Sequence, residues 1–375
     1  MAKKAARKDS TRGFLLQFLY GAAIGLCGVH SLMAAVEASA SFGQYLFCVV
    51  WMLCVLAAAG FLQILLHEGG HLVCGLLSGY RFVSYRIGSW MVQRENGVLR
   101  VHRFSLAGTA GQCLMAPPDI TNWKMPYKLY NAGGVLANLL TALLAAALAA
   151  GSHGWVPRSF WEMFCVMGIG SALTNGIPLR VQGVANDGAN VRDLGKDSAA
   201  LRAFWAQLKV NQLQADGVPL REMPEEWFAV PTGVPDNLML AAQAMLQANR
   251  LMDAQRFAET ARAIDTLTAQ STALLPLHRE LLLCDRLTCA LLTEEDAAPF
   301  AKQWNSRELQ AFRKQMKSYP SVLRTEFAVA LLVEKDTARA EKLRARLERV
   351  LCTYPYAAEA AAERSLLQKL EALGK

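Results

Sequence analysis

The chain has 375 residues, a hydrophobic fraction of 53% and a formal net charge of +8, a composition typical of a membrane protein that also carries a soluble part. The charge is uneven, because residues 1–187 hold 14 Lys/Arg and 7 Asp/Glu, whereas residues 188–375 hold 25 and 24. Nucleic-acid binding is excluded as a function class, since the basic residues flank apolar stretches and do not alternate with aromatic residues in a stripe.

The first apolar stretch covers residues 14–36 and follows a basic N-terminal segment. It is about 23 residues long, which is enough to cross a bilayer. A signal peptide would have a shorter apolar core and a cleavage site with small residues. We therefore expect residues 14–36 to be a retained membrane span.

The second apolar stretch, residues 45–77, carries the motif that points most directly to chemistry. No charged side chain occurs between Tyr45 and Leu66, and then His67-Glu68-Gly69-Gly70-His71 follows. On a helix, residues i and i+4 share a face, so His67 and His71 can bind one metal ion with Glu68 beside it. Ionisable groups within a membrane span indicate function. This segment predicts a zinc site at membrane depth.

A β-hairpin is predicted within residues 79–115. Two runs rich in β-branched and aromatic residues flank Glu95-Asn96-Gly97, and Asn-Gly between such runs is a strong signal for a two-residue hairpin turn. The edge of this hairpin could accept an extended substrate segment by strand addition. Alternatively, the hairpin only covers the site.

Two further membrane spans are predicted at residues 131–151 and 160–178. Thirteen basic residues flank one side of the four spans and one flanks the other. Positive charge is enriched on the cytoplasmic side of membrane proteins. We therefore expect a multi-pass protein of a cell membrane, by its size a bacterial plasma membrane, with both termini and the His67–His71 motif toward the cytoplasm.

A catalytic zinc ion needs three protein ligands and one open position. His67 and His71 supply two of them, and the third must come from elsewhere in the chain. The candidates are Asp187, Glu162, Asp119, His102, His153 and residues of the C-terminal half. Asp187 is preferred because it follows a span that ends on the same side as His71 and precedes a glycine, which permits close backbone approach. Asp193 is a weaker substitute.

Two domains are predicted, a membrane-embedded domain over residues 1–190 and an all-α cytoplasmic domain over residues 191–375. Apolar residues recur at helical spacing in eight segments, residues 199–213, 237–249, 253–268, 272–291, 306–317, 321–333, 337–352 and 356–372. The segment that begins at Leu251 loosely resembles a tetratricopeptide helix pair, although no clean 34-residue period runs through the domain. The domain either binds a protein partner or stabilises or dimerises the chain.

Three sequence elements together resemble the site-2 protease family of intramembrane zinc metalloproteases. They are His67-Glu68-Gly69-Gly70-His71, the small-residue segment Gly133-Gly134-Val135-Leu136-Ala137-Asn138, and Asn175-Gly176-Ile177-Pro178 leading to Asp187-Gly188. The resemblance covers residues 45–190. It departs from the family pattern in the stretch from Pro178 to Asp187, which is longer than the usual link, and no inserted PDZ-like domain is found.

The resemblance implies an α-helical multi-pass fold that binds one Zn²⁺ per chain through His67, His71 and Asp187. It also implies that Glu68 is the catalytic base and that Asn175 orients substrate or stabilises the oxyanion. The expected substrate is a membrane-associated peptide or single-span protein. The alternative is a catalytically inactive membrane scaffold that binds partners through its helical C-terminal domain.

Overall fold

The computed structural model describes residues 2–37, 41–105, 109–119, 124–181, 183–230, 237–271, 273–293 and 295–374. Within this part the chain is mostly helical and contains a small amount of antiparallel β structure. It forms two compact units. The first unit comprises Met1–Ser89 and Leu106–Ser198, and the second comprises Trp90–Ser105 and Ala199–Lys375.

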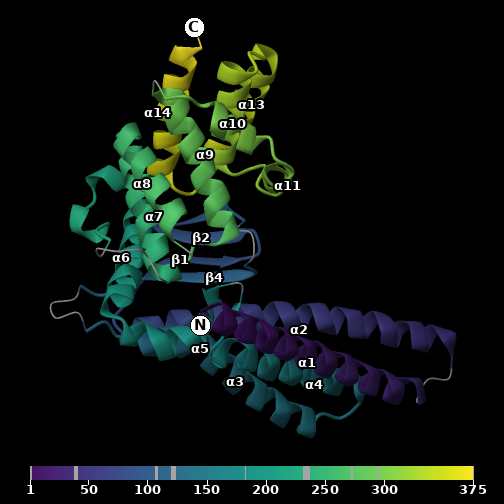
Figure 1. The fold of residues 1–375 in the computed structure, drawn as a ribbon. Coiled ribbons are helices and arrows are strands. Elements are labelled where there is room, and N and C mark those ends of the chain that lie inside the picture. The colour runs from purple at the N-terminus through teal and green to yellow at the C-terminus, as the bar shows by residue number, and fades with distance from the viewer. Residues whose placement is uncertain are drawn as a thin grey trace. The chain divides into compact units, whose positions relative to one another are not determined.

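The first unit is built on four long helices that pack side by side (Figure 1). Its elements are α1 (Ala2–Glu37), α2 (Phe42–Leu77), β1 (Arg81–Ile87), β4 (Gly111–Ala116), α3 (Tyr127–Gly151), α4 (Trp155–Gly176), β5 (Arg180–Val181), β6 (Val184–Ala185), α5 (Asp187–Asp193) and the 3₁₀ turn η1 (Leu194–Lys196). Strands β1 and β4 pair antiparallel, with Tyr85 opposite Cys113. Helix α2, which carries the motif His67–His71, contacts strands β1 and β4 and also helix α3. The motif therefore lies between the two strands and α3.

Three helices among the described residues are long and apolar enough to cross a membrane, namely Thr11–Glu37, Phe42–Leu77 and Tyr127–Gly151. Their outward faces expose large apolar side chains, such as Phe14 (71%), Leu140 (67%) and Leu143 (69%). The segment predicted as a fourth span, residues 160–178, lies largely in helix α4 but is not among these candidates. Helix α4 begins earlier than predicted, and the added turn brings in Arg158 near Glu162.

The predicted hairpin is confirmed and belongs to the second unit. Strands β2 (Trp90–Glu95) and β3 (Val98–Arg103) pair antiparallel, with Glu95 opposite Val98. Asn96 and Gly97 form the two-residue turn, and both have positive φ (48° and 85°), as the type I′ turn of a tight hairpin requires.

The rest of the second unit is helical. Its elements are α6 (Ser198–Ala215), η2 (Leu220–Glu222), η3 (Glu225–Trp227), α7 (Leu238–Asp253), α8 (Phe257–Gln270), α9 (Pro276–Leu292), α10 (Ala298–Trp304), α11 (Arg307–Gln315), α12 (Pro320–Ala328), the π-helical segment η4 (Val329–Val333), α13 (Thr337–Leu351) and α14 (Ala357–Leu373). All eight segments predicted from apolar periodicity contain a helix. Helix α10 was not predicted, because its seven residues are too few to show a period.

The helices of the second unit, residues 199–375, are called the helical unit below. This helical unit buries an ion-pair network between α9, α12 and α14. Arg324 is 1% exposed; its guanidinium contacts Asp285 and donates to Glu363 Oε1 at 2.7 Å. Glu359, one turn before Glu363, accepts a hydrogen bond from the Tyr354 hydroxyl at 3.1 Å. Burial, followed by the nearby Glu363, raises the pKa of Glu359 to about 7.

We expect Glu359→Gln to remove a pH dependence from the stability of this unit. A carboxyl group whose folded pKa is raised stabilises the fold fully only below its unfolded pKa, and this contribution is lost as pH rises through about 7. Between pH 6 and pH 8 the free energy of unfolding of the wild type should therefore fall by about 1 kcal/mol more than that of the variant. Urea midpoints from pulse proteolysis at the two pH values test this. The exposed Glu341, as Glu341→Gln, should leave the pH dependence of the wild type unchanged.

Candidate metal centre

Helices α2 and α5 bring together the three side chains that the sequence singled out as metal ligands. His67 Nε2 and His71 Nε2 lie 3.2 Å apart. Asp187 Oδ2 lies 3.1 Å from the first nitrogen and 3.4 Å from the second. Among the described residues, no other group of three His, Cys, Asp or Glu side chains is placed to hold a metal ion.

The hydrogen bonds of the two imidazoles decide which ring nitrogen faces the centre of this group. His71 Nδ1 lies 2.8 Å from the Tyr130 carbonyl oxygen, which only accepts, so Nδ1 carries the proton. His67 Nδ1 lies 2.6 Å from Asn138 Oδ1. Both Nε2 atoms of the neutral rings are therefore lone-pair acceptors that face a carboxylate oxygen.

Three acceptors at such short distances fit a metal ion well. They cannot hydrogen-bond to one another without an added proton, and a cation between them removes the conflict. Tetrahedral ligands at metal–ligand distances of about 2.0–2.1 Å lie about 3.3 Å apart, which agrees with separations of 3.1, 3.2 and 3.4 Å. The group could hold a metal ion with an open fourth position.

Asn138 on α3 fixes the orientation of the His67 ring. Its amide nitrogen donates to the Gln63 carbonyl oxygen at 3.1 Å and to Gln63 Oε1 at 2.6 Å, so Oδ1 must face His67. The Gln63 amide donates in turn to the Phe164 carbonyl oxygen at 3.0 Å. This chain of hydrogen bonds runs from α4 through α2 and α3 to the site, and Asn138 and Gln63 are almost completely buried.

We expect Asn138→Ala to weaken metal binding by about 10- to 100-fold, the usual effect of losing the partner that orients a histidine ligand. The matched control is Thr141→Ala, one turn further along α3, because the Thr141 hydroxyl donates to carbonyl oxygens of its own helix. Competition titration of zinc with a chelator measures both affinities. Equal losses in the two variants would show that a polar group on α3 matters only for packing.

Small residues allow α2 and α3 to approach closely at the site. A β-carbon on Gly70 would lie 2.7 Å from Ala137 Cβ and still closer to the Gly133 carbonyl oxygen. A β-carbon on Gly134 would overlap the His67 ring, 2.6 Å from its Nδ1. The backbone of α3 therefore forms one wall of the site, and only glycine fits there.

Glu68 lies beside the ligand group and is 9% exposed. It accepts a hydrogen bond from the Cys113 backbone N–H in β4, and Gly111 of the same strand leaves space for its side chain. The Cys113 carbonyl oxygen accepts from the Tyr130 hydroxyl at 2.8 Å. Strand β4 thus links the carboxylate of Glu68 with Tyr130, whose carbonyl oxygen holds His71.

The long link before Asp187 folds back on itself, which explains how Asp187 reaches the site. Strands β5 and β6 form a small antiparallel pair within this link. Two hydrogen bonds of 3.0 and 3.1 Å between Leu179 and Asn186 hold the two ends of the link together. Asn186 also caps α5 by accepting from Ala189 N–H. The extra residues therefore do not displace Asp187, the first residue of α5.

Other sequence candidates lie outside the ligand group. The Asn175 amide donates to the Ser171 carbonyl oxygen of its own helix at 3.0 Å, so its predicted role toward substrate stays a prediction. The Arg192 guanidinium and then the Lys196 ammonium hold the pKa of Asp193 at about 2, and these ion pairs engage its carboxylate. His102 pairs with Glu95 in the hairpin.

No family model matches this chain, and no curated protein or solved structure matches it. The chemistry of the site is therefore inferred from its own residues and their geometry.

Proposed function

We propose that this protein is an intramembrane zinc endopeptidase that hydrolyses peptide bonds of membrane-associated substrates. The observation that carries the proposal is the convergence of three acceptor atoms from His67, His71 and Asp187. They lie beside the buried carboxylate of Glu68, on a helix apolar and long enough to cross a membrane.

Zinc is the metal that best suits these donors. Two imidazole nitrogens and one carboxylate with an open fourth position are the ligand set of hydrolytic zinc sites. Sites for magnesium or calcium consist of oxygen ligands, so two nitrogens argue against both. No thiol of the described residues joins the group, which favours a catalytic site over a closed structural one.

Glu68 is the residue we assign as general base. A bound zinc ion supplies Lewis acidity, which makes water a nucleophile near neutral pH. Glu68 takes up the proton that water releases and passes it to the amine as the carbon–nitrogen bond breaks. The Cys113 N–H holds the Glu68 carboxylate in place, while Asn138 and the Tyr130 carbonyl oxygen hold the two imidazoles.

The proposed substrate is a membrane-associated peptide or a single-span protein, and the protein is proposed to sit in a cell membrane with several spans. The three candidate spans and their exposed apolar faces support this placement. The excess of basic residues on one side of the apolar segments supports cytoplasmic termini. A helical substrate must unwind locally before attack, because its carbonyl groups are held in intrahelical hydrogen bonds.

The test compares membrane-bound peptides from cells that produce the wild type with those from cells that produce Glu68→Gln. Full-length substrates should accumulate with the variant, and shortened products should appear only with the wild type. Glu37→Gln, an exposed position at the end of α1, is the matched control and should behave as the wild type does. Identical peptide patterns for wild type and Glu68→Gln would contradict a peptidase and favour the scaffold function.

A further inference from the structure

The helical unit contains a cavity and a groove that the proposed peptidase site does not use. The cavity, about 260 Å³, is lined by α7, α9, α12 and α14. The groove, about 480 Å³, lies beside it between the end of α7 and α14. Met252, Asp253, Ala358 and Ala362 line both, so the two spaces adjoin.

The walls of these spaces carry an excess of negative charge. Four carboxylates line them, contributed by α7, α9 and α14, against two guanidinium groups: Asp253, Asp285, Glu359 and Glu363 against Arg221 and Arg324. Arg221 is paired with Asp253 at 2.9 Å. Arg324 is therefore left to balance three carboxylates, and burying the excess charge is costly without a counter-charge.

Two polar atoms of this network are buried without a partner. Glu363, 6% exposed, leaves Oε2 without a donor, and Arg324, 1% exposed, leaves Nε–H without an acceptor. Both residues line the cavity. A ligand that brings a cationic donor would give the Glu363 carboxylate a further partner.

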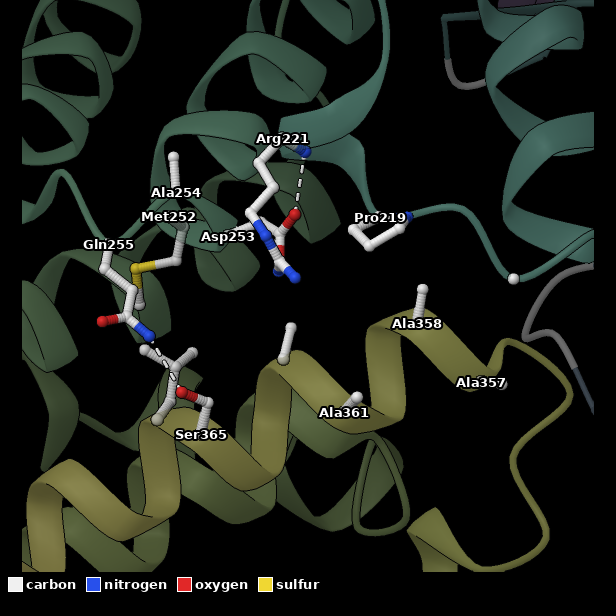
Figure 2. Close-up of a pocket in the computed structure, with 13 residues that line it drawn as sticks. Pro219, Arg221, Met252, Asp253, Ala254, Gln255, Ala357, Ala358, Ala361 and Ser365 are labelled. Atoms are coloured by element: carbon white, nitrogen blue, oxygen red, sulfur yellow. Dashed lines mark hydrogen bonds and ion pairs between the residues drawn. The ribbon is translucent and has the colours of Figure 1, made fainter.

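The groove is shaped to take a peptide backbone. Figure 2 shows α14 as its floor, with Ala358 and Ala361 facing the open space and with Pro219, Arg221 and Asp253 on the opposite side. Side chains no longer than a methyl group allow a peptide backbone to approach the helix closely. Met252 and Leu366 lie where groove and cavity join, and they can cover the aliphatic part of a long side chain.

We propose that the helical unit binds a peptide segment through one lysine or arginine side chain, which enters the cavity and pairs with Glu359 and Glu363. The peptide backbone lies in the groove on α14. This site is independent of the metal centre, so it stands whether or not the protein is a peptidase.

Binding should strengthen as pH rises. The charged and titratable groups around the cation are Arg221 on η2, Asp253 on α7, Asp285 on α9, Tyr319 before α12, Arg324 on α12, Tyr354 before α14, and Glu359 and Glu363 on α14. With its pKa raised to about 7 by burial and by Glu363, Glu359 is largely protonated at pH 6 and must lose that proton to pair with a cation. The affinity is expected to be about tenfold higher at pH 8 than at pH 6.

The probe is a fluorescent Ala-Ala-Lys-Ala-Ala peptide, measured by anisotropy with the full chain in detergent. The chain carries Glu68→Gln so that the probe stays intact. We expect the lysine peptide to bind at least about tenfold more tightly than its norleucine analogue, the usual effect of a charge-assisted hydrogen bond. Glu359→Gln and Glu363→Gln should each cause a similar loss, whereas Glu341→Gln on α13 should cause none.

Three outcomes would overturn the proposal. They are equal affinity for the lysine and norleucine peptides, full affinity in Glu359→Gln, and displacement of the probe by spermidine at the concentration at which unlabelled lysine peptide displaces it. The last outcome would identify a site for free amines. Glu359→Gln decides if Glu363→Gln fails to fold, because within the described residues the Arg324 guanidinium pairs with Asp285 and Glu363, and Glu359 bonds instead to the Tyr354 hydroxyl.

Discussion

Asp187→Ala is expected to remove the metal ion from the purified protein as completely as His67→Ala does. The wild type should contain one zinc ion per chain, and each variant close to none. Both side chains place an acceptor atom in the same group of three, with separations of 3.1 to 3.4 Å. Loss of one protein ligand leaves two, and two are too few for the three-ligand site that catalytic zinc requires.

Metal analysis of the purified protein checks this, with two matched controls. Asp193→Asn removes a carboxylate six residues further along the chain, which is held by Arg192 and Lys196, and should keep the metal. Glu68→Gln should also keep it, while turnover should fall by about 10²- to 10⁴-fold, the range for loss of a general base. Zinc retained in Asp187→Ala would disprove Asp187 as the third ligand.

The positions of the metal-ligand candidates could be predicted from the sequence because they follow from helical spacing and from the order of the motifs along the chain. A spacing of four residues places His67 and His71 on one face of any α-helix. The position of Asp187 does not follow from spacing in the same way, because a long link precedes it and sequence spacing does not show whether such a link closes. The hydrogen bonds between Leu179 and Asn186 close it, and they depend on tertiary structure.

The residues that orient the ligands could not be assigned in this way. Asn138 belonged to a recognised motif, but an asparagine in an apolar helix more often bonds to a neighbouring helix than to a catalytic group. Here it does both, since its nitrogen bonds to Gln63 and its oxygen to His67. The part played by the Tyr130 carbonyl oxygen could not be predicted at all, because a backbone group leaves no sequence signal.

Tertiary contacts also decided parts of the fold that periodicity left open. The hairpin turn at Asn96-Gly97 was predictable because positive φ at two successive positions selects these residues. The unit that the hairpin joins could not be predicted, since this depends on contacts such as the hydrogen bond from Asn96 N–H to Asp216 in the second unit. The strand next to Glu68 is β4, which lies at an edge of the sheet. If an extended substrate binds by strand addition, β4 is therefore the strand with which we expect it to pair.

Gly134→Ala is expected to impair the metal centre while leaving the helices folded. The new methyl group would overlap the His67 ring, which Asn138 holds from one turn further along α3. The ring must therefore leave its hydrogen bond, or α3 must move away from α2, and overpacking of this kind costs about 1–3 kcal/mol. If the strain falls on the ring, zinc affinity should fall by about tenfold or more, as a competition titration with a chelator would show.

Two other glycines make this result interpretable. Gly25→Ala on α1 meets no atom within 4 Å, so zinc affinity and thermal stability should match the wild type. Gly70→Ala meets the backbone of α3 at Gly133 and should lower the thermal stability of the whole first unit, because backbone yields less readily than a side chain. If Gly134→Ala instead keeps both full zinc affinity and the thermal stability of the wild type, the His67 ring does not lie against α3, and the hydrogen bond from His67 to Asn138 is wrong as well.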